Sequence, residues 1–75
     1  MTPRLPSMTS RDVVRKLKKA GFIEWRQSGS HLSMYRDHDR KSLTIPVHFK
    51  KDIPIGTLRA IIREAGMTVD EFLEL

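Results

Sequence analysis

Residues 22–48 alternate apolar and polar side chains in three short runs, and this pattern constrains the fold more than any other feature of the chain. Alternation with a period of two is typical of strands that bury one face. The runs cover 22–27, 30–36 and 42–48, and the turn signals Ser28-Gly29 and Asp37–Arg40 separate them. Such short links join antiparallel strands. We therefore predict a three-stranded antiparallel sheet.

A first helix is predicted before these runs. Thr9 and Asp12 have the spacing of a capping box, apolar residues then recur at helical intervals, and Gly21 supplies a left-handed stop. Residues 1–8 hold two prolines and show no periodicity, so we expect a flexible N-terminal arm there. The remaining residues, 9–75, are too few for more than one domain.

A second helix is predicted after the runs. Pro54 suits the first turn of a helix, an apolar stripe follows it, and Gly66 ends the stripe. Thr68 and Glu71 form another capping box, which opens a short C-terminal helix. Both longer helices must cover the apolar face of the sheet, because no other segment is available to do so. The expected class is α+β with the order α-β-β-β-α.

A strand register follows if Ser28-Gly29 and 37–40 are the two hairpin turns. Trp25 would then lie opposite Leu32, and Leu32 opposite Ile45. Directly opposed residues share a face. The register collects an apolar face: Ile23, Trp25, Leu32, Met34, Leu43, Ile45 and Val47. It also collects a polar face: Glu24, Arg26, His31, Ser33, Tyr35, Thr44 and His48.

Charge and composition narrow the class of partner. The net charge is +5, and residues 1–51 hold twelve Lys/Arg against four Asp/Glu, whereas 52–75 hold two against five. A basic body favours a polyanionic ligand, above all nucleic acid, over the simpler explanation that the charges only aid solubility. Without cysteine there is neither a disulfide nor a thiolate zinc site. With no apolar run of membrane length and no signal-peptide pattern, we expect a soluble cytoplasmic protein.

The polar face brings together groups that could cleave RNA. The register places His31 and His48 at one end of this face, with Arg26 across from His31. A neutral imidazole can accept the proton of a ribose 2′-hydroxyl, and a guanidinium can stabilise charge on the phosphate. RNA carries its own nucleophile, so no metal is required. From position alone, however, an exposed histidine is more often ordinary surface than catalytic.

Further residues are weaker candidates. Lys50 and Lys51 precede the second helix and could bind phosphate together with its N-terminus, although a solvated loop is the competing interpretation. Tyr35 could assist at the site, but ordinary strand residues often look the same. Two histidines without a third converging ligand make a poor metal site. By this register Trp25 belongs to the core and is no stacking platform.

Four segments together resemble the HicA toxin family of toxin–antitoxin pairs. They are KKAGF at 18–22, GSH at 29–31, TIPVH at 44–48 and PIGTLRAIIREAGMTVDEF at 54–72. The resemblance implies a fold like that of the double-stranded-RNA-binding domain and cleavage of messenger RNA without a metal or other cofactor. It identifies His31 with the family's catalytic histidine and implies a HicB-type antitoxin as partner.

With the resemblance, His31 becomes the expected catalytic acid/base, and His48, Arg26 and Tyr35 remain auxiliary candidates. The expected RNA-binding residues are Gly29, Ser30, Lys50, Lys51 and Lys19. The toxin is expected to be a monomer when free. The alternative function is a non-catalytic RNA-binding module of the same fold, which would need the basic surface but not the imidazole.

Overall fold

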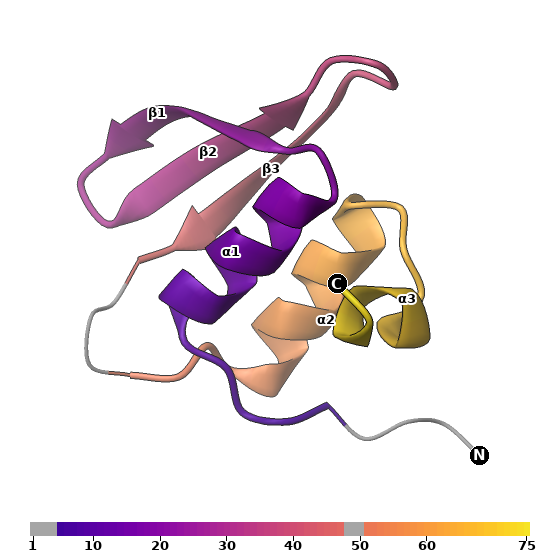
Figure 1. The fold of residues 1–75 in the computed structure, drawn as a ribbon. Coiled ribbons are helices and arrows are strands. Elements are labelled where there is room, and N and C mark those ends of the chain that lie inside the picture. Colours follow the sequence, from indigo (N-terminus) through magenta and orange to yellow (C-terminus); the bar gives the residue numbers. More distant parts are fainter. Residues whose placement is uncertain (1–4, 48–50) are drawn as a thin grey trace.

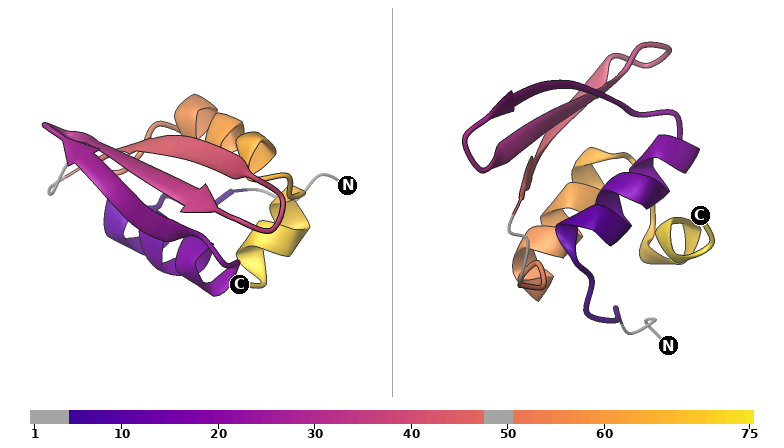
Figure 2. Two further views of the ribbon diagram at one scale, coloured as in Figure 1. Left: turned by 90° about the horizontal axis from the view of Figure 1, so that it is seen from above. Right: turned by 60° about the vertical axis from the view of Figure 1, so that its left-hand side comes forward.

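The computed structural model describes residues 5–47 and 51–75 and has the predicted α+β architecture. Helix α1 (Ser10–Lys19) is followed by strands β1 (Ile23–Ser28), β2 (His31–Arg36) and β3 (Lys41–Pro46), then by α2 (Ile55–Glu64) and the short α3 (Val69–Leu73). The strands form an antiparallel sheet in the order β1-β2-β3. The helices lie on one side of this sheet (Figures 1 and 2), so its other side is uncovered by them.

Local signals set the helix ends where the sequence predicted them. The Thr9 hydroxyl accepts a hydrogen bond from the Asp12 N–H at 3.2 Å, and the Asp12 carboxylate accepts one from the Thr9 N–H at 3.4 Å. Thr68 and Glu71 form the same reciprocal box at α3. After α1, Gly21 has a φ of +98°, a conformation that side chains with a Cβ rarely adopt. Each of these ends is therefore encoded within a few residues.

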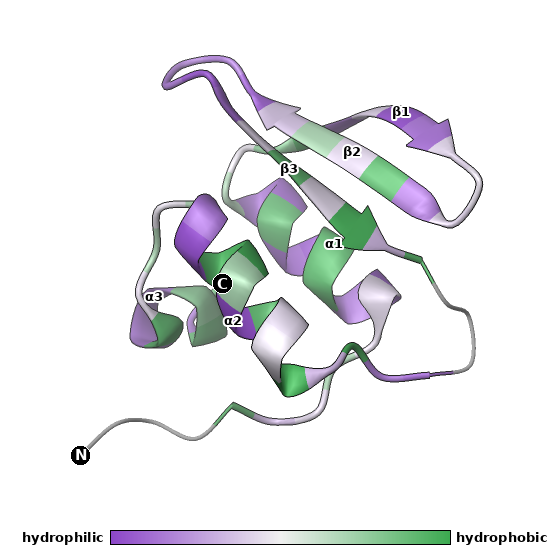
Figure 3. Cartoon of the chain, turned by 180° about the vertical axis from the view of Figure 1, so that it is seen from behind, coloured by the Kyte–Doolittle hydropathy of each residue, from purple (hydrophilic) through white to green (hydrophobic). Residues whose placement is uncertain are grey.

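A single core fills the space between the sheet and the helices. Alternate residues of β2 and β3 point into it, and apolar stretches recur along α1 and α2 (Figure 3). The side chains buried most completely are those of Phe22, Phe72, Leu17, Met34, Ile45, Leu58 and Val13. Leu32 and Met34 are buried in β2, so the residues between them and beside them point the other way.

The register of β2 with β3 is the predicted one, with Leu32 opposite Ile45 and Arg36 opposite Lys41. The predicted register of β1 is wrong. Ser28 pairs with His31, so the hairpin turn is Gly29-Ser30 instead of Ser28-Gly29. A second irregularity, between Glu24 and Arg26, leaves Trp25 as the extra residue of a β-bulge.

The displaced turn shifts the register by two residues and keeps each face, so it is the bulge that moves three side chains away from their expected faces. Ile23 and Trp25 were expected in the core but are 59% and 58% exposed. Glu24 was expected on the polar face, but it lies opposite the buried Met34 and forms an ion pair with Lys18 of α1. No residue of β1 is buried. Strand β1 is therefore held mainly by its backbone pairing to β2.

The uncovered side of the sheet is called the open face below. Its members are the residues that alternate with the buried ones and those paired directly with them: Ile23, Arg26, Ser28, His31, Ser33, Tyr35, Ser42, Thr44 and Pro46. The predicted polar face is thus confirmed for the described residues of β2 and β3, whereas in β1 it loses Glu24.

Arg36 ties the helical layer to the far end of the sheet. Its guanidinium donates to the backbone carbonyls of Ala20 (2.8 Å) and Ala65 (3.3 Å), which follow α1 and α2. It also lies over the Phe22 ring, 4.5 Å from the centroid, and holds Asp39 through two hydrogen bonds. The hydrogen bonding from Arg36 is the main reason why the pKa of the Asp39 carboxyl falls to about 2.

The described part of the expected arm is packed. Leu5 and Met8 are buried in the core, and the Met8 carbonyl accepts a hydrogen bond from the Ile53 N–H at 2.8 Å. Thr9 also forms a β-bridge with Asp52. The chain before α1 is thus tied to the chain before α2. Among the described residues, no helix is long and apolar enough to cross a membrane.

Candidate active site

A tight turn sets the position of His31. Gly29 and Ser30 form the two-residue loop between β1 and β2, and Gly29 has a φ of +59°. Positive φ at the first loop residue is typical of hairpin turns whose twist matches the flanking strands. The Ser30 carbonyl accepts a hydrogen bond from the Val47 N–H at 2.7 Å, which links the turn to the chain after β3. His31, the first residue of β2, therefore stands on a well-braced hairpin.

The imidazole of His31 is exposed on the open face. Its neighbours across the strands are Ser28 on β1 and Pro46 on β3, and the next residue of β2 on the same face is Ser33. Within 5–47 and 51–75, no hydrogen bond or ion pair engages the His31 ring. The described residues thus leave both ring nitrogens open to a molecule that lies on this face.

Arg26 shares the open face with His31, although not in the predicted pairing. It lies opposite Ser33, and Ser28 takes the place directly across from His31. Arg26 is therefore a diagonal neighbour of His31, and such pairs have Cβ atoms about 7–8 Å apart. The Arg26 side chain is exposed and makes no ion pair with a described carboxylate. A phosphate group could contact both side chains.

The structure does not bring Tyr35 to His31. Tyr35 is four positions after His31 along β2, which is about 13 Å of strand. The Tyr35 hydroxyl donates a hydrogen bond to the Asp37 carboxylate at 3.2 Å. Partial burial, this hydrogen bond and the nearby charges of Asp37 and Asp39 raise the pKa of Tyr35 above its usual value. The Tyr35 hydroxyl is therefore neutral, and it lies in the half of the sheet away from His31.

Comparison with known families identifies the family of the chain. A family model described as the HicA toxin of bacterial toxin–antitoxin systems matches residues 10–67, which is most of the chain. The chain belongs to the HicA toxin family. It is thus a toxin of a toxin–antitoxin system, a class of protein that is paired with an antitoxin. A search of curated proteins found no significant match.

The HicA match extends from the start of α1 past the end of α2, so it includes the hairpin turn and His31. Helix α3 lies beyond it. Gly29 and Ser30, expected to contact RNA, are exposed in the turn beside His31. Lys51 is exposed and precedes Asp52, whereas Lys19 is exposed in the last turn of α1, in the helical layer. His48 and Lys50 lie outside the described residues.

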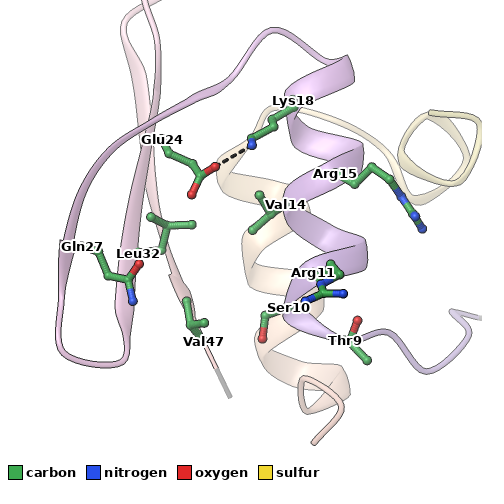
Figure 4. A pocket seen from close by; sticks show the side chains of 10 residues that line it. All are labelled: Thr9, Ser10, Arg11, Val14, Arg15, Lys18, Glu24, Gln27, Leu32 and Val47. Carbon is green, nitrogen blue, oxygen red and sulfur yellow. Dashed lines mark ion pairs between the residues drawn. The ribbon is translucent and has the colours of Figure 1, made fainter. Parts of the chain in front are cut away.

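A cleft that the sequence did not predict lies between α1 and the β1–β2 hairpin. Its volume is about 680 Å³, and it opens on the helical side of the sheet (Figure 4). Apolar side chains of Val14, Leu32 and Val47 line it, and Arg11 and Lys18 stand at its edge. The cleft exists because Gln27, and no apolar residue, lies opposite Leu32. Only the corrected register of β1 could have revealed it.

The described residues offer no ready-made site for a metal ion. Nowhere in 5–47 or 51–75 do three His, Cys, Asp or Glu side chains gather closely enough to share one. The groups that the open face does present around His31 are an arginine and the hydroxyls of serine and threonine. These are hydrogen-bond donors suited to phosphate and sugar oxygens.

Proposed function

We propose that this HicA-family toxin is an endoribonuclease that cleaves messenger RNA without a metal ion, with His31 as its catalytic acid/base. The observation that carries the proposal is the exposed His31 imidazole at the hairpin turn, with the Arg26 guanidinium, which no described carboxylate pairs, on the same face. Family membership supports it, because HicA toxins are generally mRNA interferases. The open face is shallow, as suits a polymeric substrate.

The reaction needs two proton transfers around one phosphorus atom. A base removes the proton from a ribose 2′-hydroxyl, and the 2′-oxygen attacks the adjacent phosphorus. The P–O5′ bond breaks, and the departing 5′-oxygen takes up a proton. The products are a 2′,3′-cyclic phosphate and a 5′-hydroxyl. Histidine suits such transfers because its ordinary pKa of about 6.5 leaves both forms accessible near neutral pH.

Arg26 is assigned to the phosphate. A guanidinium stays protonated and cannot act as a base, but it can stabilise the charge that grows on the phosphate oxygens. Gly29 and Ser30 would contact the RNA backbone at the turn, and Lys51 would attract it, while Lys19 is placed to contact only RNA that reaches the helical layer. His48 remains a candidate for the second proton transfer, and Tyr35 is too far along β2 for that role.

The partner is proposed to be a HicB-type antitoxin that covers the open face around His31. A protein that occupies this face would block the RNA from the imidazole directly. In the absence of the antitoxin, the toxin is proposed to act as a monomer on messenger RNA in the cytoplasm, because the proposed catalytic groups come from one chain.

The test compares His31→Ala with His38→Ala. His38 is also exposed but lies in the β2–β3 turn, far from the open-face groups around His31. Purified parent, His31→Ala and His38→Ala proteins are incubated with RNA in excess EDTA. We expect the parent and His38→Ala to cleave, and His31→Ala to lose at least about 100-fold in rate, as for loss of general acid–base catalysis.

Two controls separate the alternatives. The circular dichroism spectrum and RNA affinity of His31→Ala should match those of the parent, since the exposed ring contributes little packing. A substrate with 2′-deoxyribose only at the cleaved nucleotide should resist cutting. Equal cleavage by His31→Ala and the parent would refute the assignment, and RNA binding without cleavage by either would favour a non-catalytic RNA-binding module.

A further inference from the structure

The β-bulge in β1 puts the chain's single tryptophan on the surface. Trp25 is the residue without a partner on β2, between Glu24 and Arg26, and it is 58% exposed. A bulge re-aims the side chain at the inserted position. An indole ring has a large apolar surface, and burying it in the core of so small a domain would stabilise the fold. Its exposure therefore needs an explanation other than folding.

Trp25 borders a slot that crosses the sheet. The slot has a volume of about 360 Å³, and its lining residues are Trp25, Ser33, Ser42, Leu43, Thr44 and Glu64. Ser33, Ser42 and Thr44 belong to the open face, so the indole lies on the same side of the sheet as His31. The slot thus combines one large aromatic surface with three hydroxyl groups, each able to donate and to accept a hydrogen bond.

The slot is close to His31 along the sheet. Trp25 is three residues from Ser28, the cross-strand partner of His31, which corresponds to about 10 Å of strand. Arg26 lies between Trp25 and Ser28 along β1 and shares the open face with His31. A nucleic-acid strand whose phosphate lay at His31 and Arg26 would therefore carry a neighbouring base toward the indole.

We propose that Trp25 is a stacking platform for an unpaired RNA base that lies within a nucleotide or two of the bond cleaved at His31. This inference rests on the proposed ribonuclease function and adds the substrate class, single-stranded RNA. A base in a duplex has both faces covered by its neighbours, so only an unpaired base can lie on the indole. Ser33, Ser42 and Thr44 supply hydrogen-bonding groups for the edge of that base.

The chemistry on this face favours RNA over an apolar protein segment as the occupant. Three hydroxyls and one carboxylate, that of Glu64, line the slot beside the ring. Arg26, which follows Trp25 in the chain, forms no ion pair with a described carboxylate, and the basic balance of residues 1–51 attracts a polyanion. An aromatic platform beside a positive charge and polar groups is the usual arrangement for binding unpaired bases.

The first experiment uses Trp25 as its own reporter, because the chain has no other tryptophan. The His31→Ala protein, which keeps its substrate intact, is titrated with a short single-stranded RNA while tryptophan emission is recorded. Binding of the same labelled RNA is followed independently by anisotropy. We expect saturable quenching that parallels the binding curve, and little quenching when the RNA is annealed to its complement.

The second experiment uses variants with a matched control. Trp25→Ala should weaken binding of single-stranded RNA about 10-fold, within the range found when an aromatic stacking partner is removed. Trp25→Phe keeps a ring and should recover most of the loss. Ile23→Ala removes an apolar side chain of the same strand and nearly the same exposure, 59%, and should bind like the parent.

The outcomes separate this inference from the proposed ribonuclease function. RNA that binds without changing Trp25 emission, or an Ile23→Ala loss equal to that of Trp25→Ala, overturns the stacking platform even if the parent cleaves RNA. Quenching by single-stranded RNA in a protein that never cleaves it supports the platform and refutes the catalysis. A Trp25→Ala protein that keeps its RNA affinity but loses the antitoxin overturns the inference and assigns the ring to the protein interface.

Discussion

Replacing Arg36 by Ala should destabilise the fold more than the loss of any other single positive charge that the structure describes. The Arg36 side chain is only 13% exposed, and among the described residues of the sheet it alone donates hydrogen bonds to the C-terminal ends of both α1 and α2. Removing it leaves the Ala20 and Ala65 carbonyls without their charged donor and uncovers one face of the Phe22 ring.

The magnitude follows from these contacts. The short bond to the Ala20 carbonyl, 2.8 Å, is charge-assisted, and bonds of this kind contribute roughly 1.5–3 kcal/mol. The longer bond to Ala65, 3.3 Å, contributes less, and the cation–π contact with Phe22 adds about 1 kcal/mol. Because such terms are not additive, we expect a total loss of about 3 kcal/mol. That is a large part of the stability of a small domain, typically about 5 kcal/mol at the low end.

Urea unfolding followed by circular dichroism measures this loss. With a slope of about 1–2 kcal/mol per molar urea, the midpoint for Arg36→Ala should fall by roughly 1.5–3 M. Arg59→Ala is the control, because Arg59 is exposed on α2 and forms no ion pair with a described residue; its midpoint should stay close to that of the parent. Equal midpoints for the two variants would refute the view that Arg36 fastens the helices to the sheet.

Two further predictions concern charge. Asp39 has a native pKa of about 2, below its ordinary value of 3.8, so its carboxylate stabilises the folded state above about pH 4, and this contribution disappears as the pH falls toward 2. In urea unfolding, Asp39→Asn should therefore be less stable than the parent at pH 7, with the gap closing at low pH; a gap that is constant with pH would contradict the ion pair. Arg26→Gln should weaken RNA binding and reduce the slope of log affinity against log salt by about one phosphate contact, whereas Arg59→Gln on the helical side should leave the slope unchanged; identical slopes for both would remove Arg26 from the phosphate site.

Some of the site could be predicted because it depends on one strand alone. His31 shares its face with Ser33 because Leu32 and Met34 point into the core, and this alternation is visible in the sequence of β2. The prediction that His31 lies on the open face is therefore confirmed, although the predicted turn was displaced by one residue. The phosphate assignment of Arg26 needed more, because its distance from His31 depends on the pairing of β1 with β2.

The cases of Trp25 and Glu24 show why β1 could not be predicted in the same way. A displaced turn and a bulge each change which residues face each other, and neither leaves a mark in an apolar–polar pattern. The pattern of β1 looks like that of a half-buried strand, yet none of its residues is buried. The exposed indole, the Lys18–Glu24 ion pair and the cleft beside α1 all result from this difference.

By itself, the sequence determined the features that short-range interactions control. The capping boxes at Thr9 and Thr68, the stop at Gly21 and the alternation of β2 and β3 act over a few residues, so they can be read without knowing the fold. Only the tertiary structure decided how β1 lies on β2 and where Arg36 reaches. Those choices depend on contacts between segments far apart in the chain, and a free-energy balance over the whole domain, which no local pattern records, selects among them.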